Sequence, residues 1–324
     1  MDASAAIADA RYAQVQTVTA GAVTAVQSFW SGATPDRILA AMSGGVGKQI
    51  MNAVLLGQVS AAQGAQAYVT GAMLAQGAGL ETLGRLTPAS FAGFASDGRP
   101  LATLLMLPAI NTARALAGGM APSSAMAMGL EQMARMVSTQ INDAARVATS
   151  VAMAAEPRCI SYVRVVKLPA CARCIILAGR QYSYSEGFRR HPKCDCGMEP
   201  MSDREWRDSE SNPRKLYESM SPEDRIKRFG AAGVDAMANG SDMGQVVNAR
   251  RGMTTTATGK TVTTEGATKR GIGGRALNTG FEKVPGKRYM RAREARLMPE
   301  QILNNAHGDR ELQVALLRKH GYIT

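Results

Sequence analysis

The sequence predicts a mainly α-helical protein with a small central β region, an α+β architecture whose N-terminal half is helical and rich in alanine. Three observations indicate this class. Ala, Met and Gly are abundant while aromatic residues make up only 5% of the chain, which suits closely packed helices better than an all-β sandwich. The first half repeats apolar residues at three- and four-residue steps, the period of an amphipathic helix. A β-rich run follows Pro157, directly before a cluster of cysteines.

The N-terminal half contains two long predicted helices. The first covers residues 3–30, where apolar residues share one face. The second begins at Pro122 and ends before Glu156 and Pro157, because the residue that precedes a proline is displaced from helical geometry. Residues 49–86, between them, are expected to be mostly helical. The packing face of the second helix is expected to comprise Leu130, Met133, Val137, Ile141, Ala144, Ala148 and Val151.

Four of the five cysteines and one of the three histidines fall within residues 171–196. Two residues separate Cys171 from Cys174, and two separate His191 from Cys194, with Cys196 just beyond. Each spacing is that of a turn which directs two side chains at one ion, and structural Zn²⁺ takes four thiolate or imidazole ligands in a tetrahedron. The pattern therefore predicts a structural zinc site. Spacing alone leaves open whether Cys194 or Cys196 completes the ligand set, or whether both displace His191.

Three other readings of the cysteines stay open. The first Cys-x-x-Cys pair could be a redox motif, although no thioredoxin-like βαβ pattern surrounds it. A catalytic zinc site would use three protein ligands and keep one open position. The cysteines could also pack without metal. Cys159 lies outside the ligand spacing and is expected to be a small buried residue.

The segment around the ligands is expected to be β structure. Residues 160–166 predict a strand that leads into Cys171. The 16 residues between the two ligand pairs predict a β-hairpin that turns at Gly179 and Gly187. Its aromatic side chains, expected to pack over the metal, are Tyr182, Tyr184 and Phe188.

Changes in composition divide the chain into five expected segments, and most of the positive charge lies in the last two-fifths of it. Residues 1–150 carry 8 basic and 7 acidic side chains, whereas residues 201–324 carry 22 and 15. The segments are an Ala/Met-rich helical assembly domain (1–156), a Cys/His zinc-hairpin region (157–200), a small helical unit (201–253), a flexible Thr/Gly-rich linker (254–280) and a basic helical segment (281–324).

The basic C-terminal half implies an acidic partner, either nucleic acid or an acidic protein face. The densest run of charge contains an aromatic residue, Tyr289, and leads into an expected last helix from Pro299 to His320. The ordinary reading of this run is a solvated helix face, and the sharper reading is contact with DNA or with an acidic protein surface. Its basic members are Lys283, Lys287, Arg288, Arg291, Arg293 and Arg296.

We expect neither a secretory signal nor a membrane segment. The N-terminus MDASAAIADARYAQ lacks the basic and apolar regions of a signal peptide. The longest run without charge, residues 49–80, is interrupted by Gln, Asn, Ser, Thr and Gly. The expected compartment is therefore the reducing cytosol, where clustered cysteines bind metal more often than they form disulfides.

The run RVVKLPACARCIILAGRQYSYSEGFRRHPKCDCGMEP (164–200) resembles the Cys/His segment of MuF-like minor head proteins of tailed bacteriophages. It is most similar to the form found in phages of actinobacteria, which is often labelled capsid maturation protease. Three further stretches, residues 225–253, 263–271 and 296–323, are also similar to that group. The N-terminal helices carry no matching motif. The resemblance therefore covers about residues 155–324.

The resemblance implies a minor component of the virion head. Such a protein is built into the procapsid in the host cytoplasm and lies in the head interior or near the portal. Its implied partners are portal, major capsid or scaffold proteins, with packaged DNA as a further partner for the basic half. The family's ligand pattern falls on Cys171, Cys174, His191, Cys194 and Cys196.

The label given to the relatives requires a test for proteolysis. With His191 taken as a ligand, only His307 and His320 are left for a Ser-His-acid triad. The sequence contains no His-Glu-x-x-His pair and no nucleophile elbow. We therefore expect a structural protein with no identified catalytic residues. The alternative is a head maturation protease that acts on scaffold or shell protein.

Overall fold

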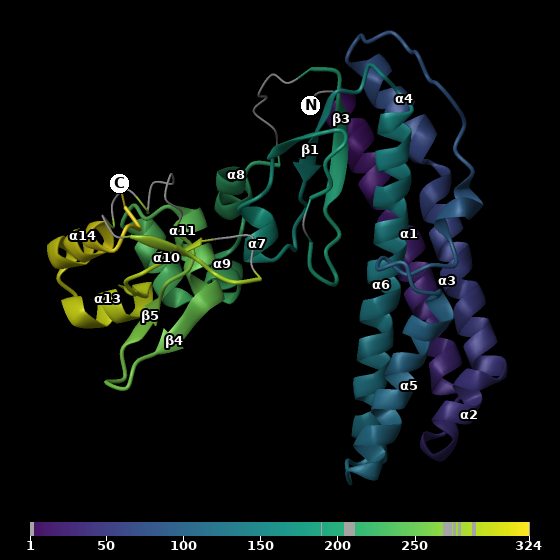
Figure 1. The fold of residues 1–324 in the computed structure, drawn as a ribbon, viewed down its shortest axis with the longest axis horizontal. Coiled ribbons are helices and arrows are strands. Elements are labelled where there is room, and N and C mark those ends of the chain that lie inside the picture. The colour runs from purple at the N-terminus through teal and green to yellow at the C-terminus, as the bar shows by residue number, and fades with distance from the viewer. Residues whose placement is uncertain are drawn as a thin grey trace. The chain divides into compact units, whose positions relative to one another are not determined.

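The structure is a computed structural model in which the chain forms two compact units, each described here by itself (Figure 1). The first unit comprises Met1–Lys167 and Gly179–Ser209, and the second comprises Leu168–Ala178 and Glu210–Thr324. Helices predominate and the sheets are small and antiparallel, which confirms the predicted fold class. The described residues are 3–188, 190–203, 211–267, 274, 277, 280–286 and 290–323.

Long helices form most of the first unit. Figure 1 shows α1, α3, α5 and α6 running side by side, and α6 packs against the other three. Gly44 ends one short helix before the next begins, and Pro122 is the first residue of α6, as predicted. The helices are α1 (Ala3–Ser31), α2 (Ile38–Ser43), α3 (Gly45–Gln63), α4 (Ala65–Ala75), α5 (Leu101–Ala117) and α6 (Pro122–Ala154), with short 3-10 turns at Pro35–Arg37 and Pro88–Phe91.

The core of this unit lies between α1, α3, α5 and α6. Trp30 and Val26 of α1 and Ile50 of α3 are almost fully buried in it. Close approach requires small residues, and a Cβ on Gly129 of α6 would lie 2.7 Å from the Trp30 ring. The predicted stripe of α6 contributes Met133, Val137 and Ile141, all buried, and a neighbouring cluster contains Ala148.

Two expectations for this half are wrong. Val151, placed on the packing stripe, is 43% exposed. Residues 78–86, expected to be helical, have no regular structure. This loop instead contacts the residues just after α6. The carboxylate of Glu156 accepts hydrogen bonds from the Glu81 amide at 3.1 Å and from the Thr82 hydroxyl at 2.7 Å. These tertiary contacts satisfy the loop's polar groups in place of helical hydrogen bonds.

A three-stranded sheet completes the first unit. Its central strand is β1 (Ser161–Val165), flanked by β2 (Gln181–Ser183) and β3 (Gly197–Met201). All five residues of β1 are buried, as expected for a central strand. β2 pairs with β1, with Tyr162 opposite Tyr182. The predicted hairpin between the two ligand pairs is therefore wrong, because the strand leading into Cys171 supplies the partner of β2.

The aromatic residues of this segment pack beside the sheet. The rings of Tyr162 and Tyr182 stack with centroids 5.3 Å apart, and Phe188 lies 6.0 Å from Tyr182. Tyr184, expected in the same cluster, is 41% exposed. Two of the three predicted aromatic residues, Tyr182 and Phe188, therefore pack with Tyr162 in one ring cluster.

The second unit consists of short helices and strands around a core that contains Phe229, Ile302, Leu317 and Tyr322. Its sheets have the orders β4-β5-β8 and β6-β7. Its helices are α7 (Ala172–Ile175), α8 (Pro213–Glu218), α9 (Pro222–Phe229), α10 (Ala231–Ala238), α11 (Met243–Ala249), α13 (Pro299–Ala306) and α14 (Arg310–Lys319). Its strands are β4 (Met253–Thr255), β5 (Thr261–Thr263), β6 (Phe281–Lys283), β7 (Met290–Ala292) and β8 (Arg296–Leu297).

Three sequence-based expectations for this unit need correction. The start of the expected linker is the β4–β5 hairpin, because its Thr-rich ends pair across a turn at Gly259. The basic run, expected as a helix face, lies partly on β6, β7 and β8. The expected last helix is two helices, since His307 and Gly308 adopt positive φ angles of 48° and 87° that end α13. Among the described residues, no helix is long and apolar enough to cross a membrane.

Candidate metal centre

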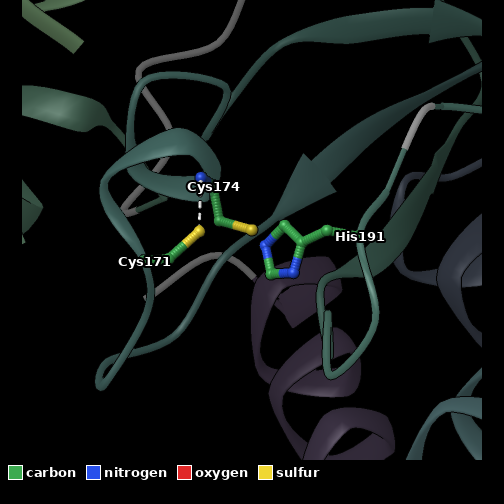
Figure 2. Close-up of side chains that lie close together, drawn as sticks. All are labelled: Cys171, Cys174 and His191. Carbon is green, nitrogen blue, oxygen red and sulfur yellow. Dashed lines mark hydrogen bonds between the residues drawn. The ribbon is translucent and has the colours of Figure 1, made fainter. Parts of the chain in front are cut away.

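The first ligand pair lies on a single turn of helix. Cys171 is the N-cap of α7, and its Sγ accepts a hydrogen bond from the Cys174 amide at 3.4 Å. Figure 2 shows this contact as a dashed line. The turn therefore presents two sulfurs at one end of a short helix, the arrangement predicted from the Cys-x-x-Cys spacing.

The second ligand pair lies on a tight turn. The Cys194 amide donates to the His191 carbonyl at 3.0 Å, and Lys193 between them has a positive φ of 65°. His191 Nδ1 lies 2.7 Å from the Pro192 carbonyl oxygen. Since a carbonyl can only accept, Nδ1 carries the hydrogen of this contact, which leaves Nε2 with a lone pair for a metal.

The structure gathers the five predicted ligands into two overlapping groups. Single ligand atoms of Cys171, Cys174 and His191 lie within 4.8 Å of one another, and so do those of Cys174, Cys194 and Cys196. Two sulfurs bound about 2.3 Å from one tetrahedral zinc ion would lie about 3.8 Å apart, which is within that limit. The donor set of thiols and one imidazole fits zinc. Cys174 belongs to both groups, so the choice between Cys194 and Cys196 stays open.

An arginine from the central strand lies against two of the sulfurs. Arg164 of β1 is 1% exposed, and its Nη2 lies 3.4 Å from Cys196 Sγ and 3.7 Å from Cys194 Sγ. Its guanidinium also covers the Phe188 ring at 4.3 Å from the centroid. A buried cation beside sulfur stabilises the thiolate, which is the form that binds metal.

A second arginine holds the main chain of the same turn. Arg146 Nη1, from α6, donates to the carbonyls of Cys194 at 3.0 Å and Cys196 at 3.1 Å. A second nitrogen of the same guanidinium, Nη2, pairs with Asp143, which also binds Arg190. Burial acts to raise the pKa of Asp143, but the hydrogen bond from Arg190 and the charge of Arg146 outweigh burial and hold this pKa below its usual value.

The supporting roles of Arg146, Asp143 and Arg164 were not predicted from the sequence. A signal was present, because Asp143 and Arg146 form an i,i+3 pair of opposite charge in a helix that is otherwise rich in Ala and Met. Arg164 likewise interrupts a β-branched run that is buried along its length.

Asp195, which lies between Cys194 and Cys196, is hydrogen-bonded to α1. Asp195 Oδ2 accepts a hydrogen bond from the Tyr12 hydroxyl at 2.6 Å. Burial raises the pKa of Asp195, and the hydrogen bond from Tyr12 opposes this effect without cancelling it. The turn is thus attached to α1 as well as to α6.

The fifth cysteine lies outside both groups, as expected. Cys159 is 1% exposed, and its Sγ donates to the Ser161 carbonyl at 3.4 Å. Burial raises the pKa of this thiol to about 11. At neutral pH Cys159 is therefore a protonated, buried side chain with little nucleophilic character.

The two histidines considered for proteolysis have different environments. His307 is exposed in the turn between α13 and α14. His320 is half-buried, and its Nδ1 accepts a hydrogen bond from the Leu297 amide at 3.4 Å. Burial, followed by the charges of Lys319 and Arg296, lowers the pKa of His320. The charges that act on this ring are positive, so they oppose the imidazolium that a general base must form.

One member of the basic run, Arg296, is buried and does not lie at the surface. Arg296 is 1% exposed, donates to the carbonyls of His320 and Glu265 at 3.2 Å each, and covers the Tyr322 ring. Both readings of Arg296, a solvated face and a contact with DNA, are therefore wrong, because its guanidinium lies in the core of the second unit. Arg291 pairs with Glu282 at the surface. Lys287, Arg288 and Tyr289 lie outside the described residues.

The fold and the site together define a mainly helical protein with a Cys/His cluster of the metal-binding kind. Comparison with protein families gives a match to the family described as VG15 protein, over residues 109–222. The matched stretch is about a third of the chain, and it contains α6, the three-stranded sheet and all five candidate ligands. It supports a bacteriophage-related protein. No curated protein and no solved structure gives a significant match.

Proposed function

We propose that this chain is a MuF-type minor head protein of a bacteriophage virion, built into the procapsid near the portal or the shell interior, with a structural zinc site in residues 171–196. The observation that carries the proposal is the VG15 match, which covers the stretch where the candidate ligands gather. The resemblance of residues 155–324 to MuF-like proteins supports the same assignment.

The ligand environment favours a structural over a catalytic metal. Cys174, Cys194 and Cys196 are only 3%, 2% and 1% exposed. Structural zinc sites are closed and rich in thiolates, whereas catalytic sites leave one position for water. With five candidate donors for four positions, protein atoms can fill the coordination sphere. The metal would then stabilise the fold of this segment instead of activating a substrate.

The helices of the first unit offer surfaces suited to protein partners. A groove between α1 and α3 is lined by uncharged residues, among them Gly21, Phe29 and Ala53. Leu56, which also lines it, is 67% exposed. Exposed apolar residues in a groove without charge favour contact with another protein over contact with nucleic acid. We assign this face to a portal, major capsid or scaffold protein.

Assembly in cells tests the proposal. The chain is co-expressed with the portal, shell and scaffold proteins of its phage, and procapsids are purified and analysed by mass spectrometry. We expect the chain in procapsids assembled with the portal, with the shell and scaffold proteins left uncleaved. Absence of the chain from procapsids would contradict the proposal. Specific cleavage of scaffold or shell that is lost on replacing His307 or His320, with zinc retained, would instead support a maturation protease.

A further inference from the structure

We propose that Arg146 is a positioning residue of the metal centre, which sets the geometry of the Cys194–Cys196 turn before a metal binds. This inference rests on the zinc site proposed above. It concerns a residue of α6 that offers no ligand atom and lies 48 and 50 positions before the carbonyls that it contacts.

The contact restrains the backbone on which two ligands lie. One nitrogen of Arg146, Nη1, reaches the carbonyl oxygens of Cys194 at 3.0 Å and Cys196 at 3.1 Å. Its two hydrogens can be shared between the two acceptors, which flank Asp195. Fixing both peptide groups fixes the directions of the Cα–Cβ bonds and therefore where the two sulfurs can lie.

Arg146 is itself firmly held. Its side chain is 11% exposed, and Nη2 pairs with Asp143, whose side chain is 4% exposed. The same carboxylate accepts from Arg190 and from the Ser96 hydroxyl. Charged hydrogen bonds in a buried setting are stronger than those at a surface. The guanidinium of Arg146 is therefore held by Asp143 of α6. Asp143 is held in turn by Ser96 in the loop before α5 and by Arg190.

Two further contacts attach the turn to the helices. The Lys193 amide donates to Thr139 Oγ1 of α6 at 3.0 Å, and the Tyr12 hydroxyl of α1 donates to Asp195 at 2.6 Å. Neither contact uses a ligand atom. In small zinc domains the metal organises an otherwise unfolded chain. Here α1 and α6 supply anchors of their own, so we expect the turn to keep its place without the metal.

Metal affinity in matched variants tests this role. We compare wild type with Arg146→Met, which removes both carbonyl contacts, and Arg146→Lys, which keeps the charge. The control is Arg135→Met, a change at an exposed arginine of the same helix. Zinc affinity is measured by competition with a chromogenic chelator, and the ligand field is followed by the absorption spectrum of the Co²⁺-substituted protein.

We expect Arg146→Met to weaken zinc binding about 10- to 100-fold, the range found for residues that orient metal ligands. The lysine variant should lie between it and wild type, and Arg135→Met should match wild type. Helical circular dichroism should be unchanged while the cobalt spectrum shifts. Equal affinity in Arg146→Met and Arg135→Met would overturn the inference and leave the zinc site standing. A wild-type protein that binds no zinc would overturn both.

Hydrogen exchange on the wild-type protein keeps the test decisive if Arg146→Met fails to fold. The amides of Lys193 and Cys194 donate to Thr139 and His191 and should stay protected after the metal is removed with a chelator. Protection retained within a few-fold of the metal-loaded protein supports the inference. Exchange at the rate of an unstructured peptide after chelation would show that the metal organises the turn, and would overturn it.

Discussion

Asp143 illustrates how one buried residue supports the whole ligand turn. Its carboxylate pairs with Arg146 and Arg190, and Ser96 donates to it as well. Removing one member of a buried ion pair is costly because the partner charge stays in a poorly solvated place. The residue is therefore more important for stability than its single charge suggests.

We expect Asp143→Asn to destabilise the protein by about 3 kcal/mol, at the lower end of the range for breaking buried ion pairs because Arg190 is partly exposed. Urea denaturation followed by circular dichroism measures the change. The control is Glu131→Gln, an exposed acidic residue of the same helix, which should change stability by less than about 0.5 kcal/mol. Equal effects of the two substitutions would contradict the role given to Asp143.

The pH dependence of stability provides a second test of this residue. Because the pKa of Asp143 is lowered in the folded protein, its contribution is fully present above the unfolded value of about 3.9 and is lost as the pH falls through the folded pKa. Wild type should therefore lose stability faster than Asp143→Asn below about pH 4. Parallel curves of unfolding free energy against pH for the two proteins, from about pH 5 to about pH 2.5, would contradict this account.

At the scale of helices and strands, glycines set how closely the helices pack. A Cβ on Gly129 of α6 would lie 2.0 Å from Thr112 Oγ1 and 2.7 Å from the Trp30 ring. A Cβ on Gly21 of α1 would have nothing within 4 Å. Replacing each glycine with alanine therefore distinguishes two effects. At Gly21 only the preference of alanine for helices acts, whereas at Gly129 the cost of overpacking is added.

We expect Gly129→Ala to lower the free energy of unfolding by about 1–3 kcal/mol, although alanine favours the helix by about 1 kcal/mol. The matched change, Gly21→Ala, should raise it by about 0.5–1 kcal/mol. Thermal denaturation of both variants measures the difference. A Gly129→Ala protein as stable as Gly21→Ala would show that α5, α6 and Trp30 are not packed as described.

The elements that could be predicted from the sequence are those determined by patterns among neighbouring residues. The apolar period identified α1, and the two prolines identified both ends of α6. The ligand spacing predicted the turns at Cys171 and His191 for the same reason, since each turn depends on a few neighbouring residues. Local pattern was therefore sufficient for α1, for α6 and for these two turns.

Features that depend on distant contacts were not predictable in this way. The partner of β2 is a strand about 20 residues earlier, and nothing in the spacing distinguishes it from a partner within a hairpin. Residues 78–86 form a loop instead of the expected helix, and their contacts with Glu156 lie about 75 positions along the chain. Arg146 and Arg296 were read as ordinary charged residues because burial of a cation depends on acceptors far along the chain.

At the scale of the whole molecule, charge separates two parts of the sequence. Residues 1–150 are nearly neutral, whereas residues 201–324 carry 22 basic and 15 acidic side chains. Among the described basic residues, Lys260, Lys283 and Arg293 are exposed. We propose that this part of the chain contacts packaged DNA, while the helices of the nearly neutral part contact protein.

We expect the full chain to bind duplex DNA weakly, with an affinity that falls on the order of 100-fold between 50 and 200 mM salt if about four phosphates are neutralised. Replacing Lys260, Lys283 and Arg293 with Gln should weaken binding and reduce the salt dependence. Lys48→Gln, in the neutral half, is the control. Fluorescence anisotropy with a labelled duplex gives both quantities. Binding that is absent at low salt, or insensitive to salt, would contradict the proposal.

The account depends most on the metal centre, and the zinc content of the purified full chain tests it directly. Mass spectrometry under native conditions should find one zinc ion per chain, lost in Cys174→Ser because both ligand groups share that sulfur, and retained in Cys159→Ser. Comparing Cys194→Ser with Cys196→Ser then identifies the ligand that completes the set. A folded wild-type chain without zinc, or a Cys174→Ser variant that keeps it, would contradict the central claim.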